Sequence, residues 1–332
     1  MIDLGQMGDV VLSMPALRAI SERYRGSFRV VLVGSACAEL VRLSGLFDEV
    51  IEIDRVRLLH GKKFVSSVEI LRFAWGIRRR GFDIVIDLHS LPETNLLGFF
   101  SGAPTRLFAH RESRSIDLLS NVRPRPPKED KSRHASQGYL DALSPLGIEG
   151  ADPRFWITPT GEDTREIENL LPSGWPLIGL NPGAGNSSRR WPAEGFRDLA
   201  ISLGDGGCSV VIFLGPEDSE LRDKLGSLAC EGIVLLEGLS LRHLAAAYSV
   251  VDVVVGNDTG PVHIASAVGA NVIVLVTDVS PRRFLPMGEN VSIVSGHSLD
   301  AITVFEVKAA IERRLTQKES EKQENPKQNN TE

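Results

Sequence analysis

The chain has 332 residues, 42% of them hydrophobic and 24% charged, which is typical of a soluble globular protein with enough apolar material for two domains. Its three cysteines, Cys37, Cys208 and Cys230, are scattered and lack the spacing of metal ligands, so we expect a reduced, cytoplasmic protein. No basic stretch followed by an apolar run opens the chain, and no uncharged apolar segment approaches about 18 residues, which argues against a signal peptide and a membrane span.

The net charge of −6 is unevenly distributed. Residues 1–150 hold 21 Lys and Arg against 18 Asp and Glu, whereas residues 151–332 hold 16 against 25. The basic excess is concentrated in residues 78–80 and 106–133. A solvated face is the simpler interpretation, and the alternative is a surface for an anionic acceptor or for anionic lipid head groups, which would make this a peripheral membrane protein. Nucleic acid is disfavoured because few aromatic residues are interleaved and the chain as a whole is acidic.

In the N-terminal part, only four residues precede the turn at Gly5, although a buried strand normally has about 5–6 residues. We therefore expect a truncated first strand, with the true start of the protein upstream of Met1. A helix then runs from Asp9 through Ile20. Residues 92–133 are rich in Arg, Ser and Pro, and we assign no element there. Apolar runs and helical spacing predict the other elements of this part, which are strand 28–33, helix 36–44, strand 50–53, helix 65–80, strand 82–88 and helix 139–146.

Residues 151–174 have the composition of a linker around one short charged helix. A second alternating series follows, and it consists of strand 177–181, helix 193–204, strand 209–214, helix 218–229, strand 233–235, helix 241–249, strand 251–256, helix 263–268 and strand 271–277. Residues 317–332 are polar throughout, so we expect a disordered tail.

Alternation of strands and helices in both parts predicts an α/β fold with parallel sheets. We expect two doubly wound, Rossmann-like domains that face a cleft, an N-terminal one at residues 1–155 and a C-terminal one at residues 172–316. Ligands of such sheets bind beyond the carboxyl ends of the strands, so the loops that follow strands are the candidates for chemistry.

The first such loop lies in LGQMGDVVLSMPALRAI, residues 4–20. Gly5 and Gly8 allow a sharp turn, and Asp9 stands at the head of the helix. The spacing by itself favours Asp9 as a helix cap. The functional alternative is a carboxylate at a cleft-facing helix start that accepts a proton.

The second loop lies in NPGAGNSSRRWPAEGF, residues 181–196. A Gly/Ser-rich turn that contains Gly183 and Ser188 follows a strand, and Arg189 comes directly after it. Arginine beside a loop of backbone N–H groups is a phosphate clamp, and the simpler alternative is a solvated basic pair.

The third loop lies in GNDTGPVHIASAVGANVIVL, residues 256–275. Thr259 and Gly260 precede a helix whose first N–H groups have no partner within the helix and whose dipole is positive there, and both features favour a bound phosphate. His263 lies in the first turn, where a satisfied capping histidine is the simpler interpretation.

In this order and spacing, the three loops together resemble the motifs of glycosyltransferase family 9, the ADP-heptose:lipopolysaccharide heptosyltransferases. FDIVIDLH, residues 82–89, is similar to a fourth segment of that family, and the resemblance extends over residues 1–315. The third motif is the most specific.

The resemblance implies a two-domain GT-B fold and inverting transfer of heptose from ADP-heptose to a Kdo or heptose of the lipid A core. The N-terminal domain would hold the acceptor and the C-terminal domain the nucleotide sugar. The family's catalytic aspartate falls on Asp9. The donor and phosphate would be bound by Gly183, Ser188, Arg189, Asp258, Thr259, Gly260, Pro261 and His263, and the acceptor side would include Gly8, His89 and Arg111. Apart from the resemblance, Glu237 follows a predicted strand and is a candidate for contact with the ribose or base.

The sequence departs from the family at one position and leaves alternative functions open. The family often has lysine where Arg189 stands, and arginine changes the geometry of the contact. The chain has no Asp-x-Asp pair, so we expect no essential divalent ion and no cofactor. The alternatives are a transferase or epimerase for another nucleotide sugar, and a catalytically inactive protein that binds a nucleotide sugar.

Overall fold

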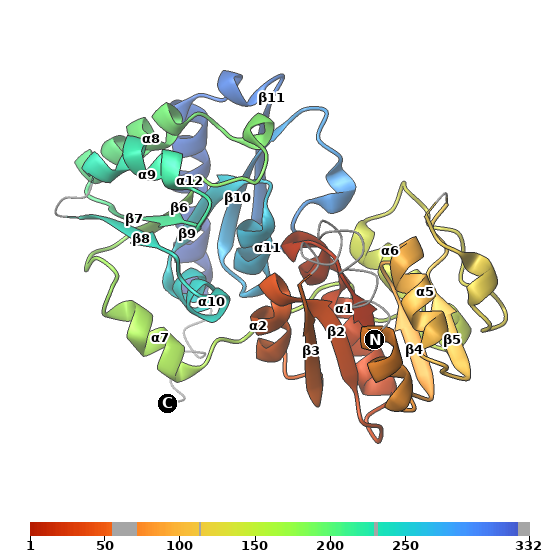
Figure 1. Cartoon of the computed structure of the whole chain (residues 1–332). Helices are drawn as coiled ribbons and strands as arrows, with labels where there is room; N and C mark the ends of the chain where they lie inside the picture. The colour runs from red at the N-terminus through yellow and green to blue at the C-terminus, as the bar shows by residue number, and fades with distance from the viewer. Residues whose placement is uncertain (55–71, 113, 229–231, 325–332) are drawn as a thin grey trace. The chain divides into compact units, whose positions relative to one another are not determined.

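The computed structural model describes residues 1–54, 72–112, 114–228 and 232–324. The chain forms two compact units (Figure 1), each built on a parallel sheet. The first unit comprises Met1–Phe155 together with the short segment Arg282–Phe284, and the second comprises Trp156–Pro281 and Leu285–Glu332.

The first unit has a five-stranded sheet in the order β3-β2-β1-β4-β5. Its strands are β1 (Ile2–Asp3), β2 (Val30–Gly34), β3 (Glu49–Ile53), β4 (Ile84–Asp87) and β5 (Thr105–Phe108). The two-residue β1 is the central strand, and Ile2 pairs with Leu32 of β2 on one side and with Asp87 of β4 on the other. The carboxyl end of this strand therefore lies in the middle of the sheet edge.

Helices of the first unit connect these strands. They are α1 (Met7–Arg23), α2 (Ser35–Leu43), a helix over residues 72–79, α5 (Pro92–Phe100) and α6 (Ala135–Asp141), with short 3-10 turns η1 (Asp117–Leu119) and η2 (Ser144–Leu146). Residues 65–71 of the predicted helix 65–80 lie outside the described residues.

The segment 92–133, to which the sequence assigned no element, contains α5 and β5. The helix begins where the Leu91 N–H donates to Thr94 Oγ1 at 2.9 Å, and Gly98 lets it lie directly on the ring of Phe108. Because α5 has apolar residues on its outer face as well as toward the core, its pattern lacks the amphipathic period on which the prediction depended.

The second unit has a six-stranded parallel sheet in the order β11-β10-β9-β6-β7-β8. Its strands are β6 (Leu177–Asn181), β7 (Ser209–Leu214), β8 (Ile233–Glu237), β9 (Val253–Asn257), β10 (Asn271–Thr277) and β11 (Val291–Gly296). The predicted strands in this part correspond to β6 through β10. The edge strand β11 was not predicted, since it is only partly buried and has no continuous apolar run.

Two layers of helices enclose this sheet (Figure 1). One layer contains α8 (Ala193–Asp205) and α12 (Val304–Glu324), and the other contains α10 (Leu241–Val250) and α11 (Gly260–Ala267). The second unit also has α7 (Gly161–Glu168), α9 (Ser219–Leu225), η3 (Ser187–Arg189), η4 (Gly226–Leu228) and η6 (Leu299–Ala301), whereas η5 (Arg282–Phe284) belongs to the first unit. No helix in the described ranges combines the length and the apolar character needed to cross a bilayer.

The C-terminal helix corrects one expectation. Residues 317–332 were predicted to be disordered, whereas α12 continues to Glu324. Residues 317–324 are mostly Gln, Lys and Glu, which are good helix formers, and Lys318 Nζ donates to Asp252 Oδ1 at 2.9 Å. Residues 325–332 lie outside the described residues.

Candidate functional site

In the first unit, Asp9 lies at the third position of α1 and caps its N-terminus. The backbone N–H of Gln6 donates to Asp9 Oδ2 at 3.2 Å. The N-cap residue itself is Gln6, so Asp9 contributes to the cap from within the first turn and is not the N-cap that the sequence suggested. This contribution does not exclude a second role, because the Asp9 side chain is only partly buried at the carboxyl end of β1.

Gly5 brings three polar side chains together. A Cβ on this residue would lie 2.7 Å from Asp9 Cβ, 3.0 Å from His89 Cε1 and 3.2 Å from Asp3 Oδ1. Because these atoms surround one point, Asp3, Asp9 and His89 form a cluster for which the glycine leaves room. His89 comes from the loop after β4, the neighbouring strand in the sheet.

Asp3 is a member of this cluster that the sequence analysis missed. Its carboxylate is buried and accepts hydrogen bonds from Gly5 N at 3.1 Å and from Ser13 Oγ. Burial raises the pKa of Asp3, and the nearby His89, with Nδ1 4.0 Å from Asp3 Oδ1, opposes that rise. The available signal was an aspartate inside an apolar strand, since buried carboxylates are rare unless paired.

Tyr139 and Arg111 extend the cluster. The Tyr139 hydroxyl lies 3.5 Å from His89 Nδ1, and the Arg111 guanidinium lies 5.0 Å from the centre of the Tyr139 ring. Burial raises the pKa of Tyr139, so its hydroxyl keeps its proton at neutral pH. Of the predicted acceptor-side residues, Gly8 lies next to Asp9 in α1, while His89 and Arg111 both contact Tyr139.

One carboxylate holds two arginines in this unit. Glu129 Oε1 lies 3.6 Å from Arg111 Nη1 and 2.6 Å from Arg283 Nη2. Arg283 belongs to η5, which follows β10 in the chain yet belongs to the first unit. Glu129 and Arg283 are 154 residues apart, so no local pattern pointed to this pair.

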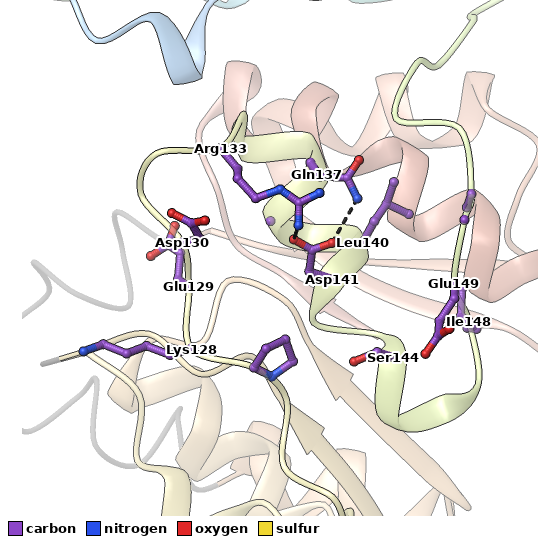
Figure 2. Close-up of a pocket in the computed structure, with 14 residues that line it drawn as sticks. Lys128, Glu129, Asp130, Arg133, Gln137, Leu140, Asp141, Ser144, Ile148 and Glu149 are labelled. Atoms are coloured by element: carbon purple, nitrogen blue, oxygen red, sulfur yellow. Dashed lines mark hydrogen bonds and ion pairs between the residues drawn. The ribbon is translucent and has the colours of Figure 1, made fainter.

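A cavity of about 330 Å³ adjoins Glu129 and is lined by the segment 127–130, by α6 and by residues 148–151. Figure 2 shows Arg133 and Gln137 converging on Asp141 at its wall, where Gln137 Nε2 donates to Asp141 Oδ1 at 2.9 Å. Among the predicted site residues, none lines this cavity.

In the second unit, the N-terminus of α11 presents backbone donors. The hydroxyl of Thr259 donates backward to Asn257 O at 3.3 Å and does not cap the helix. The N–H groups of Val262 and His263 both bond to Thr259 O, and Pro261 has no N–H. Within the described part of the chain, the N–H groups of Thr259 and Gly260 are left without an acceptor. Residues 258–261 are partly exposed, so an anion has access to these groups.

His263 does not cap α11. The side chain is buried, with Nε2 3.8 Å from Asp258 Oδ1, and Nδ1 has no hydrogen-bond partner among the described residues. The simpler interpretation, a satisfied capping histidine, is therefore wrong. A buried ring nitrogen without a partner is costly, and a ligand atom would offset that cost.

Asn257 joins the loops after β6 and β9. It is fully buried, accepts from Trp191 N at 2.8 Å and donates from Nδ2 to Pro182 O at 2.8 Å. These two strands are neighbours in the sheet, so Gly183, Ser188 and Arg189 are brought to the same edge as the start of α11. Asn257 was not among the predicted residues, although it stands between the strand and the motif.

The two arginines of the second loop differ. Arg189 is exposed. Arg190 donates from Nε to Ala184 O at 2.9 Å and lies 3.7 Å from Asp218 Oδ1. Arg189 is the one that can reach a ligand without breaking an ion pair. Ser188 bonds to Asn186 Oδ1 through both its N–H and its hydroxyl, which shapes the turn.

Glu237 ends β8 at the far side of the same sheet edge. Arg222 Nε donates to both of its oxygens, at 2.6 and 2.7 Å. A contact with ribose would therefore have to share the carboxylate with this arginine.

A group of side chains suited to a metal ion lies where α7 packs on α10. His243 Nε2 is 2.8 Å from Glu166 Oε2 and 3.8 Å from Asp163 Oδ1. Arg242 pairs with the same Asp163 oxygen at 3.3 Å. Because Arg242 already neutralises Asp163, we interpret these contacts as an ionic link between α7 and α10.

Comparisons with known proteins bear on this arrangement. Residues 70–311 match the model of the family described as glycosyltransferase family 9 (heptosyltransferase). The chain is 23% identical over 307 residues to the lipopolysaccharide core heptosyltransferase OpsX of Haemophilus influenzae, covering 91% of this chain and 85% of that protein. It is 25% identical over 305 residues to lipopolysaccharide heptosyltransferase 2 of Escherichia coli, covering 87% and 85%.

Solved structures agree in fold. The glycosyl transferase family 9 structure from Veillonella parvula has a TM-score of 0.80 at 24% identity, over 95% of this chain and 96% of that one. E. coli ADP-heptose lps heptosyltransferase II has a TM-score of 0.78 at 21% identity, over 96% and 98%. The expectation of a GT-B fold with two Rossmann-like domains is confirmed.

Proposed function

The chain belongs to glycosyltransferase family 9 and is a glycosyltransferase, and we propose that it transfers heptose from ADP-heptose to a Kdo or heptose residue of the lipopolysaccharide inner core. The names of the two curated relatives support this substrate class. The observation in the molecule that carries the proposal is the N-terminus of α11, where the N–H groups of Thr259 and Gly260 are open to an anion.

In the proposal, the second unit holds the nucleotide sugar. The diphosphate lies on the start of α11, where the helix dipole and the backbone donors stabilise its charge. Arg189 adds a cation from the neighbouring loop, and the buried His263 donates or accepts through Nδ1. As the sugar leaves, negative charge grows on the diphosphate, and these groups oppose that growth without reorganising.

The first unit supplies the base. An acceptor hydroxyl attacks the anomeric carbon of the heptose from the face opposite the diphosphate, so that a new C–O bond forms as the C–O bond to the diphosphate breaks. Asp9 takes the proton of the hydroxyl, and ADP departs with the bonding electrons. Burial raises the pKa of the neighbouring Asp3 and His89 opposes that rise, so Asp9 stands beside a buried carboxyl and an imidazole.

Acceptor recognition would use the other side of this cluster. Arg111 is held by Glu129 and by the ring of Tyr139, so its guanidinium is already oriented before a ligand arrives. Such a fixed guanidinium suits an acidic sugar, whose carboxylate it would bind in two-point fashion. His89 and the backbone at Gly8 complete the proposed acceptor side.

The test is calorimetric binding of ADP, UDP and GDP to the wild type and to Thr259→Ala, with Thr164→Ala on α7 as the matched control. We expect binding selective for ADP. In the proposal the Thr259 hydroxyl also turns from Asn257 O to the diphosphate, so Thr259→Ala should weaken binding about tenfold or more, because a hydrogen bond to a charged group contributes roughly 1.5–3 kcal/mol, and the control should leave it unchanged. Selectivity for UDP or GDP would support another nucleotide-sugar enzyme instead. Equal binding by wild type and Thr259→Ala would limit the contact to the backbone N–H groups, and no binding of any of the three nucleotides by the folded protein would refute the phosphate site.

Turnover separates the enzyme from an inactive binding protein. ADP-heptose and a Kdo-bearing acceptor should yield a glycosylated product with the wild type. Binding of ADP without any turnover of these substrates would favour the binding protein.

A further inference from the structure

Helix α5 of the first unit carries large apolar side chains on its outer face. Leu96, Phe99 and Phe100 are spaced i, i+3 and i+4, which puts them on one side of the helix, and they are 42%, 42% and 51% exposed. Leu118 of η1, which packs beside α5, is 83% exposed. We call these four side chains the α5 face. The outward side of a surface helix is normally polar, so this face is unusual.

The orientation of α5 is set by its inner side, so the exposed face cannot simply rotate inward. A Cβ on Gly98 would lie 2.8 Å from the Phe108 ring, which shows how closely the helix lies on β5. Asn95 is fully buried and donates to Asp87 Oδ2 at 2.7 Å. These contacts leave the α5 face pointing away from the sheet.

Arginines flank the α5 face and keep their charge. The Arg106 guanidinium lies 5.4 Å from the centre of the Phe99 ring and donates to the carbonyl oxygens of Leu119 and Ala103. Arg123 likewise donates to carbonyl oxygens, those of Ser120 and Val122. Since neutral carbonyls satisfy these bonds, the positive charges are not cancelled.

Arg78 adds to this charge just beyond the end of α5. Its Nη1 lies 3.0 Å from the point where a Cβ on Gly102 would be. The carboxylates on α5 and η1 are Glu93, in the first turn of α5, and Asp117, which lies 3.2 Å from His110 Nε2. The net charge around the α5 face is therefore positive.

We propose that the α5 face docks on the surface of an anionic lipid bilayer, with its apolar side chains in the acyl boundary and Arg78, Arg106 and Arg123 on lipid phosphates. Phenylalanine and leucine on one side with arginine at the rim is the composition of interfacial segments. Four side chains are few for a stable protein interface, which buries about 800 Å² per partner. A lipid surface needs no such area, and arginines with unsatisfied charge match its phosphates. This inference goes beyond the transfer reaction and uses none of the residues proposed for it.

The experiment is co-sedimentation of the full chain with vesicles of phosphatidylcholine, with and without phosphatidylglycerol, in the absence of donor and acceptor. The apolar variant is Leu96→Gln/Phe99→Gln/Phe100→Gln, and its matched control is Phe305→Gln, because Phe305 on α12 is 80% exposed in the second unit. The charge variant is Arg78→Gln, with Arg197→Gln on α8 as its control. Circular dichroism and ADP binding verify that each variant is folded.

We expect the wild type to bind the anionic vesicles more strongly than the neutral ones, with binding that falls as salt is added. The triple variant should lose about tenfold or more in partitioning, Arg78→Gln a few-fold on anionic vesicles alone, and both controls nothing. Wild-type binding that the triple variant retains, or no preference for anionic lipid, would overturn the proposal. So would a self-association of the wild type that the triple variant abolishes without lipid, since the α5 face would then join two copies. Failure of ADP to bind would count against the proposed function and leave the vesicle result standing.

Discussion

The loop after β1 and the loop after β9 hold matching places in the two sheets, yet they are built differently. Each connects a strand inside its sheet to a helix. In the first unit the helix start is closed by Asp9, and side chains that carry or bind protons surround it. In the second unit the start of α11 has no side-chain cap, and its backbone donors remain open.

One sheet plan therefore serves two purposes in this chain. A proton acceptor must be a side chain, and Asp9 stands among other polar side chains, the buried Asp3 and His89. An anion can be bound by backbone alone, so that loop needs small residues and a fixed shape.

The largest effect should come from Asp9→Asn. We expect kcat to fall about 10²–10⁴-fold, the range for loss of a general base. The asparagine oxygen still accepts from Gln6 N, so the free energy of unfolding should change by less than about 1 kcal/mol. Steady-state kinetics and denaturant unfolding measure the two quantities. Asp9→Ala, which removes cap and base together, is the control for the cap. Near-wild-type turnover by Asp9→Asn would mean that this carboxylate only caps the helix.

A large effect on stability should come from Asn257→Ala in the second unit. The substitution leaves the buried Trp191 N–H and Pro182 carbonyl without partners, which costs about 2–4 kcal/mol. ADP affinity should fall with it, because the two loops are no longer tied. Asn169→Ala, at an exposed asparagine that follows α7, is the matched control. If both variants unfold at the same denaturant concentration, Asn257 does not fix the backbone of the two loops.

The sequence predicted most of the fold because buried parallel strands are continuous apolar runs, and β6, β7, β9 and β10 all have that form. The edge strand β11 has no such run. The apolar outer face of α5 removed the amphipathic signal. Helix α12 was missed at its end because a polar segment of good helix formers was interpreted as disorder.

The candidate site divides in the same way. The loops with Asp9 and with Thr259 are contiguous segments, so the residues within each were found together. Asp3 and His89 meet only because β1 and β4 are neighbours, and Glu129 meets Arg283 across 154 residues of chain. Pairing over such separations depends on topology, which one sequence does not reveal. The roles of the predicted residues remain predictions.

A pH effect on stability should arise in the first unit, where the described buried carboxyls with raised pKa values, Asp3 and Asp87, both lie. Burial raises the pKa of Asp87 from 3.8 to about 6, so the folded state binds more protons than the unfolded state between these values. Stability should therefore fall as pH rises from 3.8 to about 6, by about 2–3 kcal/mol at most.

Denaturant unfolding of the wild type and of Asp87→Asn across this range measures the effect. As pH rises, the free energy of unfolding of the wild type should fall relative to that of Asp87→Asn. Asp83 is an exposed aspartate just before β4, so the free energy of unfolding of Asp83→Asn should depend on pH in the same way as that of the wild type. If the difference in free energy of unfolding between the wild type and Asp87→Asn stays constant, the Asp87 carboxyl is not protonated in the folded protein within this range.

The smallest effect distinguishes two glycines of one loop. A Cβ on Gly183 would lie 2.3 Å from Asp218 Oδ2, whereas a Cβ on Gly185 has no atom within 4 Å. In Gly183→Ala, Asp218 must move away from Gly215 N and from Arg190, so we expect a loss of about 1 kcal/mol and a several-fold weaker affinity for ADP, both measured by calorimetry. Gly185→Ala should leave both unchanged. Equal effects would show that the donor loop tolerates side chains on its backbone. If only Gly183→Ala lowers stability and ADP affinity, the backbone of this loop shapes the site, since neither substitution adds or removes charge.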